Sequence, residues 1–232
     1  MNIFFNGCSM VYGKDLVPQT IEQENDPYDN SHIVRTRSSW PGVLSASLNA
    51  TQVNLARCGS SMDCIFRTTY AEFNVNMHSH AIIGLTEPLR FEFFDQDTEK
   101  YSQVVLPRGS YKKMYPRSMH RFLEDVAWFF FADHACLTKY ALNILAIQYL
   151  FKSTGTPYYF VNSLADYVTP CIDRLPWFAK QFDSSCWDSS TSMFEFCKSE
   201  GVPFGSTVHP LQEGHAMFAG HVARLVTTKW KV

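Results

Sequence analysis

The chain of 232 residues is 46% hydrophobic and 15% aromatic, a composition typical of a packed globular protein rather than a disordered one. Its net charge of -2, without any run of lysine or arginine, argues against nucleic acid as the main partner. The seven cysteines are odd in number and form no CxxC pair. They predict reduced, buried thiols in a cytosolic protein rather than a disulfide framework or a zinc site.

Two stretches bear on localisation. The first residues contain neither the basic region nor the long apolar region of a signal peptide. The longest apolar region, residues 140–151, is too short to cross a bilayer and is interrupted by Asn143 and Gln148. We therefore expect a cytoplasmic protein without a membrane partner, and the oligomeric state stays open.

The N-terminal part of the chain alternates predicted strands and helices. Apolar bursts at residues 2–5, 52–56 and 81–85 predict buried strands, each ending in a small polar turn. A helix that opens at Trp40-Pro41 and a second one capped by Ser60 or Ser61 would connect them. This order is typical of right-handed crossovers in a parallel sheet.

The remaining segments complete the predicted architecture. Residues 19–31 have no apolar periodicity and predict a surface loop. Residues 91–117 break the rhythm and predict an insertion, either a hairpin or a lid over the sheet edge. Further elements are expected along the rest of the chain: a helical region at 118–152, a strand at 157–162, an irregular segment at 166–190, a short helix at 193–199, a short strand at 202–204 and a helix from 210 to about 226. With no repeat or linker, the chain reads as one domain spanning residues 1–232.

Small polar turns at three strand ends carry the candidate chemistry: Gly7-Cys8-Ser9, Cys58-Gly59-Ser60 and Gly84-Leu85-Thr86-Glu87. In open α/β sheets, ligands bind at the carboxyl ends of the strands, where these turns would lie. A serine hydroxyl becomes a nucleophile when a base accepts its proton, and His209 precedes the last helix. Ser9 is therefore a candidate nucleophile if a base can reach it, although Ser9 alone would also fit a helix cap, and each of these pieces is a weak signal by itself.

In this order, the motifs resemble those of the SGNH hydrolases, the superfamily of GDSL-type esterases and lipases. Residues 54–59 match the family pattern Asn-x-Ala-x-x-Gly, and residues 209–215 resemble its His-Pro…Gly-His signature. Gly7-Cys8-Ser9 stands where the family has Gly-Asp-Ser. The resemblance implies a three-layer α/β/α protein of flavodoxin-like type, with a central parallel sheet of about five strands.

The same resemblance implies roles for individual residues. Ser9 would attack an ester, for example an O-acetyl group on a carbohydrate, and His209 would act as general base and then as general acid. The backbone N–H groups of Ser9 and Gly59 would bind the oxyanion together with Thr86, which stands where the family has asparagine. No metal or cofactor is required, and the expected partner is a small-molecule or carbohydrate ester.

The position of the triad acid departs from the family pattern. Ser206 stands three residues before His209, where the family has an aspartate that orients and stabilises the histidine. Either the site is a Ser-His dyad, or another carboxylate, Glu87 or Glu213, supplies the acid, or the site no longer turns over. The last possibility keeps a second function open: a non-catalytic module that binds a glycan or a protein on the same fold.

Arg90 follows the third strand end closely. It could hold a carboxylate or phosphate of a substrate through two parallel hydrogen bonds. The alternative is an ion pair with Glu87 or Glu92.

Overall fold

A computed structural model describes residues 1–17, 32–96, 99–105, 117–130 and 133–231. The predicted surface loop at 19–31 lies outside these residues, as do residues 106–116 of the predicted insertion.

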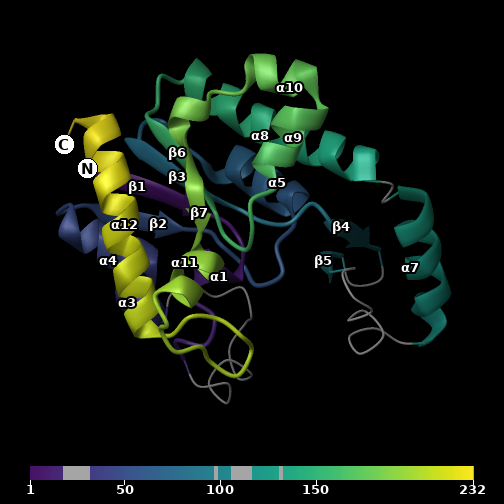
Figure 1. The fold of residues 1–232 in the computed structure, drawn as a ribbon, viewed down its shortest axis with the longest axis horizontal. Coiled ribbons are helices and arrows are strands. Elements are labelled where there is room, and N and C mark those ends of the chain that lie inside the picture. Colours follow the sequence, from purple (N-terminus) through teal and green to yellow (C-terminus); the bar gives the residue numbers. More distant parts are fainter. Residues whose placement is uncertain (18–31, 97–98, 106–116, 131–132, 232) are drawn as a thin grey trace.

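The centre of the molecule is a five-stranded parallel sheet with strand order β2-β1-β3-β6-β7 (Figure 1). Its strands are β1 (Asn2–Asn6), β2 (Thr51–Asn54), β3 (His80–Leu85), β6 (Tyr158–Asn162) and β7 (Trp187–Ser192). The predicted parallel sheet of about five strands is thus confirmed.

Helices cover both faces of the sheet and give the predicted three layers (Figure 1). One core joins the sheet to α1 (Ser9–Tyr12), α4 (Trp40–Ser47), α11 (Met193–Ser199) and α12 (Gln212–Trp230). The other core joins it to α5 (Met62–Glu72), α8 (Asp133–Ser153), α9 (Val168–Arg174) and α10 (Pro176–Gln181). Of the two serines predicted to cap α5, it is the Ser61 side chain that accepts a hydrogen bond, from the N–H of Cys64.

Two expectations about the C-terminal half were wrong. The segment 166–190 is not irregular, because it forms α9, α10, a 3-10 turn at Ser184–Cys186 and most of β7. The expected strand at 202–204 is reduced to an isolated bridge between Phe204 and Pro210. The fifth strand is β7, an edge strand of sequence Trp-Asp-Ser-Ser-Thr-Ser whose middle residues are exposed. An edge strand that faces solvent needs no apolar alternation, so the pattern that marks buried strands is missing.

Inside the predicted insertion, β4 (Arg90–Asp95) and β5 (Lys100–Val105) form an antiparallel hairpin. Arg67 on α5 holds this hairpin through two hydrogen bonds to Glu92, of 2.8 and 2.9 Å. Gln103 on β5 accepts a hydrogen bond of 3.1 Å from the N–H of Ser61, so the hairpin is fastened to the turn that begins α5.

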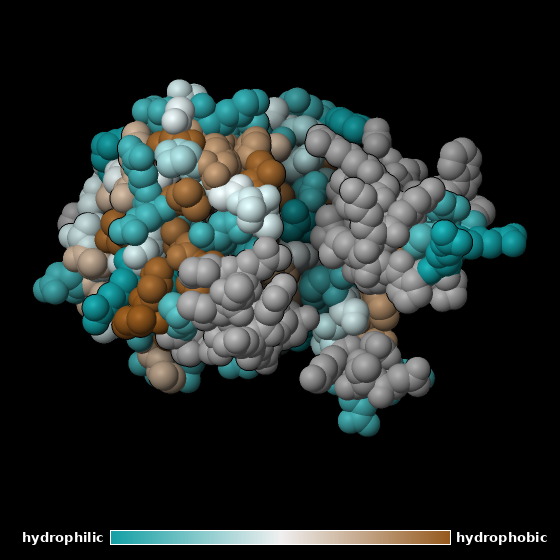
Figure 2. All heavy atoms as spheres, turned by 90° about the horizontal axis from the view of Figure 1, so that it is seen from below, coloured by the Kyte–Doolittle hydropathy of each residue, from teal (hydrophilic) through white to brown (hydrophobic). Residues whose placement is uncertain are grey.

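Two further helices complete the described chain. The short α3 (Ile33–Ser38) precedes α4, and the predicted helical region at 118–152 consists of α7 (Arg117–Phe130) followed by α8. Helix α7 stands beside the body of the molecule, beyond the hairpin (Figure 1). Seen from below, the main body exposes hydrophobic side chains interspersed with hydrophilic ones (Figure 2). Among the described helices, none combines the length and apolar character needed to cross a bilayer.

Candidate active site

Ser9 is the first residue of α1, directly after the turn that ends β1, and only 6% of it is exposed. The Asn6 side chain fixes this turn, since its amide donates to the carbonyl oxygen of Ile65 and its oxygen accepts from the N–H of Gly7. A Cβ at Gly7 would lie 2.4 Å from a methyl carbon of Val11, so only glycine allows this close passage. The turn therefore brings the Ser9 hydroxyl to the carboxyl edge of the sheet.

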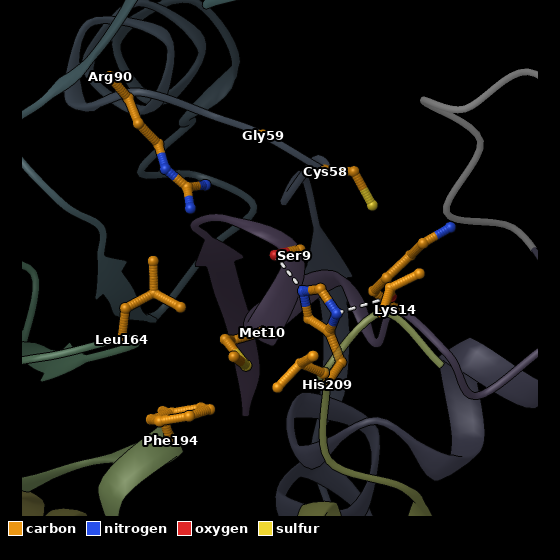
Figure 3. A pocket seen from close by; sticks show the side chains of 11 residues that line it. Ser9, Met10, Lys14, Cys58, Gly59, Arg90, Leu164, Phe194 and His209 are labelled. Carbon is orange, nitrogen blue, oxygen red and sulfur yellow. Dashed lines mark hydrogen bonds between the residues drawn. The ribbon is translucent and has the colours of Figure 1, made fainter. Parts of the chain in front are cut away.

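The predicted base lies beside this hydroxyl. His209 Nε2 is 2.7 Å from Ser9 Oγ, although 200 residues separate the two in sequence (Figure 3). The loop that carries His209 closes on itself, because the N–H of Gly205 donates to the His209 carbonyl oxygen at 2.8 Å. Val208 adopts a φ of 62°, a strained backbone conformation for a β-branched residue. The loop thus holds the imidazole within hydrogen-bond reach of Ser9.

A carboxylate that the sequence analysis missed stands behind the imidazole. Asp15 Oδ2 lies 3.9 Å from His209 Nδ1. Asp15 also accepts two hydrogen bonds from Thr207, 2.9 Å from its backbone N–H and 2.7 Å from its hydroxyl. The Thr207 hydroxyl oxygen is in turn 2.9 Å from His209 Nδ1. One assignment of protons satisfies the whole chain: Nδ1–H donates to the Thr207 oxygen, and the Thr207 hydroxyl donates to Asp15.

That assignment leaves His209 Nε2 as an acceptor for the Ser9 hydroxyl. Burial is the largest influence on the imidazole and lowers the pKa of His209 below its ordinary value. The Asp15 carboxylate acts in the opposite direction, whereas Lys14 and Arg90 lower the pKa further. His209 is therefore neutral at pH 7, the state that a general base requires.

The other predicted acids lie elsewhere. Glu87 accepts a 2.7 Å hydrogen bond from Arg90 Nε, which is the ion pair expected as the alternative role of Arg90. Glu213 is exposed in the first turn of α12. Ser206 is exposed as well, and the hydroxyl that meets the imidazole belongs to its neighbour, Thr207.

The two predicted oxyanion contacts outside Ser9 differ in their surroundings. Gly59 lines the cavity beside Ser9 and has a φ of 76°, a conformation that favours glycine. Thr86 is 1% exposed, its hydroxyl has no hydrogen-bond partner among the described residues, and it is not one of the cavity residues. Its part in oxyanion binding stays a prediction.

A cavity of about 400 Å³ opens over Ser9 and His209 (Figure 3). Apolar side chains, Met10, Leu164 and Phe194, form one side of it. The remaining lining residues in the described chain are Ser9, Lys14, Cys58, Gly59, Arg90, Thr207, Val208 and His209. Its volume suits a small organic molecule.

Candidate metal ligands do not gather in the described chain: no group of three His, Cys, Asp or Glu residues there is placed to hold an ion. All seven cysteines are free thiols, and six of them are buried. Cys58 is the half-buried exception and lies on the cavity wall.

Two other histidines, both on α12, make contacts away from Ser9. His215 is fully buried and accepts a 3.0 Å hydrogen bond from the Trp40 N–H, so it joins α12 to α4. His221 pairs with Asp188 at 2.7 Å, which links α12 to β7. The first contact joins two helices of one layer, and the second joins that layer to the sheet.

Comparison with known proteins gives a family and a fold. The model of a family described as "Family of unknown function (DUF6071)" matches residues 20–231. No curated protein matches the sequence.

Solved structures of esterases are similar in fold. The crystal structure of TesA has a TM-score of 0.54 at 10% identity, with 98% of this chain and 99% of that chain covered. A family two carbohydrate esterase from Clostridium thermocellum, in complex with cellohexaose, has a TM-score of 0.54 at 12% identity, covering 99% of this chain and 64% of that one. A family 2 carbohydrate esterase from Corynascus thermopiles (Myceliophthora fergusii) has a TM-score of 0.53 at 11% identity, covering 100% and 67%. At such identities the likeness establishes the fold alone, an α/β fold of the SGNH hydrolase type.

Proposed function

Because this chain belongs to DUF6071, a family of unknown function, we propose its activity from the site itself: it is a serine esterase with Ser9 as nucleophile and His209 as base. The observation that carries this proposal is the 2.7 Å contact between Ser9 Oγ and His209 Nε2. A serine and a neutral histidine at this distance, at the floor of a cavity, form the pair that nucleophilic acyl transfer needs.

In the first half-reaction, Ser9 Oγ attacks the ester carbonyl carbon while His209 Nε2 takes the hydroxyl proton. The negative charge moves to the carbonyl oxygen, for which the N–H groups of Ser9 and Gly59 are the proposed donors. When the intermediate collapses, the bond to the alcohol oxygen breaks, and the proton on His209 passes to that oxygen. Water then attacks the acyl-enzyme by the same route and releases the acid and free Ser9.

Asp15 takes the part of the acid that Ser206 cannot supply. The Asp15 carboxylate accepts a hydrogen bond from the Thr207 hydroxyl, and the Thr207 oxygen accepts one from Nδ1–H of His209. The proton of the neutral imidazole is thereby held on Nδ1, and Nε2 stays unprotonated. Once His209 gains the serine proton, the negative charge 3.9 Å away stabilises the imidazolium. No proton has to leave Nδ1 for this effect.

The proposed substrates are esters of short acyl groups, including O-acetyl groups on carbohydrates. The size of the cavity and its apolar side support a short acyl chain. The two structurally similar carbohydrate esterases support a sugar as the alcohol.

The test is covalent labelling with a fluorophosphonate probe, together with hydrolysis of 4-nitrophenyl acetate. We expect stoichiometric labelling that Ser9→Ala abolishes and His209→Ala slows by roughly a hundredfold or more, as for removal of a general base. Ser184→Ala, which removes an exposed hydroxyl far along the chain, is the matched control and is expected to label normally. Labelling that survives Ser9→Ala removes Ser9 as the nucleophile.

An unreactive protein that nevertheless binds an acetylated oligosaccharide or a protein would favour the non-catalytic alternative. Calorimetric titration with acetylated xylo-oligosaccharides, using the same protein preparation, separates that outcome from a misfolded sample.

A further inference from the structure

The charged residues that line the cavity wall are cations, whereas the nearest carboxylates, Glu87 and Asp15, stand behind the wall. Two of its lining residues in the described chain, Lys14 and Arg90, are cations, and none is an aspartate or glutamate. The two cations lie on opposite sides of Ser9 and His209 (Figure 3). Of the two, Arg90 turns its charged end toward Ser9 (Figure 3), and a cation facing a small site favours anions there.

Arg90 is placed to recognise a ligand at this site. Only 10% of its side chain is exposed, so its guanidinium has exchanged most of its water for protein. Its Nε donates to Glu87, at 2.7 Å, and this is the one protein acceptor recorded for it in the described chain. The terminal nitrogens point into the cavity (Figure 3).

A guanidinium offers five N–H donors in a planar fork, and Nε uses one of them here. The four terminal N–H groups have no recorded acceptor in the described chain and are not among its buried unpartnered atoms, so they face the open cavity where a ligand can reach them. A carboxylate matches the fork with two parallel bonds at once. Glu87 anchors the guanidinium from behind and fixes its plane, as preorganised recognition requires.

We propose that Arg90 binds a carboxylate of the substrate, so that the preferred esters of this site carry a negative charge close to the ester bond. This inference rests on the proposed esterase function and narrows it to a chemical class. The apolar side of the cavity, Met10, Leu164 and Phe194, receives the uncharged part of the same substrate.

The experiment compares esters in pairs that differ only by the charge. In the first pair, 4-acetoxybenzoate and its methyl ester, the carboxylate lies on the alcohol. In the second pair, mono-4-nitrophenyl adipate and its methyl ester, it lies on the acyl group. For each pair the ratio of kcat/KM, anionic over neutral, is measured for the wild type and for Arg90→Gln, Arg90→Lys and Lys180→Gln.

We expect Arg90→Gln to lower this ratio about tenfold or more for at least one pair, as for loss of a charge-assisted hydrogen bond. Arg90→Lys, which keeps the charge but not the fork, should give an intermediate ratio. Lys180→Gln, which removes an exposed cation from α10, should leave the ratio as in the wild type. Ratios that do not respond to Arg90→Gln in either pair overturn the proposal, and so does an equal loss on both members of each pair, which would make Arg90 an oxyanion or structural group.

A binding arm separates this proposal from the esterase function. Titration of 4-acetoxybenzoate is compared between Ser9→Ala and Ser9→Ala/Arg90→Gln, in which no turnover interferes. Binding that weakens about tenfold with Arg90→Gln supports the recognition even if the wild type hydrolyses no ester. Binding that is absent, or indifferent to Arg90, overturns it even if the wild type is an active esterase. Because Arg90→Gln strands Glu87, the double variant Glu87→Gln/Arg90→Gln is tested alongside, with thermal melting of each protein.

Discussion

The role of Asp15 gives the sharpest prediction, since Asp15→Asn removes a charge and keeps the shape. Two charges 3.9 Å apart interact by about 1 kcal/mol in bulk water and by about 4 kcal/mol at an effective dielectric constant of 20. Asp15 and His209 are 9% and 16% exposed, so the interaction lies between these limits. Loss of this energy from the imidazolium-bearing transition state lowers the labelling rate and kcat by roughly sixfold to roughly a thousandfold.

The substitution also disturbs the protons. An asparagine amide can donate to the Thr207 oxygen, which turns the Thr207 hydroxyl toward Nδ1 and favours the tautomer with the proton on Nε2. That tautomer cannot accept the proton of Ser9. Thr207→Val, which removes the relay, is expected to lose activity as well, and Thr207→Ser is expected to recover most of it.

The pH dependence of activity distinguishes an electrostatic role of Asp15 from a purely structural one, because a structural role would not change the pKa of His209. The base must be neutral, so activity falls as pH drops through the pKa of His209, which burial places below its ordinary value of 6.5. The Asp15 carboxylate raises that pKa, hence Asp15→Asn should shift the acidic limb to lower pH while the plateau falls.

The assay is the rate of fluorophosphonate labelling and of 4-nitrophenyl acetate hydrolysis across pH 4 to 9. Asp173→Asn, an exposed aspartate on α9, is the matched control. An unchanged plateau for Asp15→Asn, or a limb that moves to higher pH, would refute the reasoning.

Three further predictions concern the surroundings of the site. Thr86→Val should lower kcat about tenfold or more if its hydroxyl binds the oxyanion, and an unchanged kcat with normal labelling excludes that role. Burial lowers the pKa of His215 to about 3, so the unfolded chain takes up a proton between about pH 6.5 and 3 that the folded chain refuses. The free energy of unfolding is therefore highest above this pH window and falls within it by up to about 1.4 kcal/mol per pH unit. Denaturant titrations should show a weaker dependence of this free energy on pH for His215→Gln than for the wild type. The same dependence in both proteins would contradict the prediction. Gln103→Ala should leave the partly buried N–H of Ser61 without its acceptor and lower the free energy of unfolding by about 1–3 kcal/mol. The expected readouts are a lower thermal midpoint and slower labelling. An unaltered midpoint would show that the hairpin does not hold the turn that contains Gly59.

The pairing of Ser9 with His209 was accessible from the sequence partly because of how parallel sheets are built. Each apolar strand ends in a small polar turn, and all these turns meet at one edge of the sheet. Residues 54–59 and 209–215 then mark which turns belong to the site. Topology therefore predicts that the strand-end turns lie together, whereas the assignment of His209, which directly follows no strand of the sheet, rested on the resemblance of residues 209–215 to the SGNH hydrolase signature.

Asp15 could not be found in that way. It lies just beyond α1, with a φ of 67°, in a stretch without periodicity or motif. Its hydrogen-bonded link to the imidazole runs through the Thr207 hydroxyl. The carboxylate fits there because residue 205 is a glycine, since a Cβ at that position would lie 2.5 Å from Asp15 Oδ2. The one available signal was that Asp15 is the first carboxylate after the nucleophile, and proximity in sequence to Ser9 does not by itself indicate contact with a residue 194 positions later. Likewise, the polar edge strand β7 could not be recognised from apolar alternation.

The contact between Ser9 and His209 has a consequence for how the protein is made. His209 follows Ser9 by 200 positions, so the ribosome makes the proposed nucleophile well before the proposed base. Since loop closure between distant parts of a chain waits for the sheet that brings them together, a nascent or truncated chain carries an ordinary, unactivated serine. If Ser9 is the proposed nucleophile, its reactivity reports that translation has passed His209 and that the sheet has formed, so the labelling reaction can serve as an assay of folding.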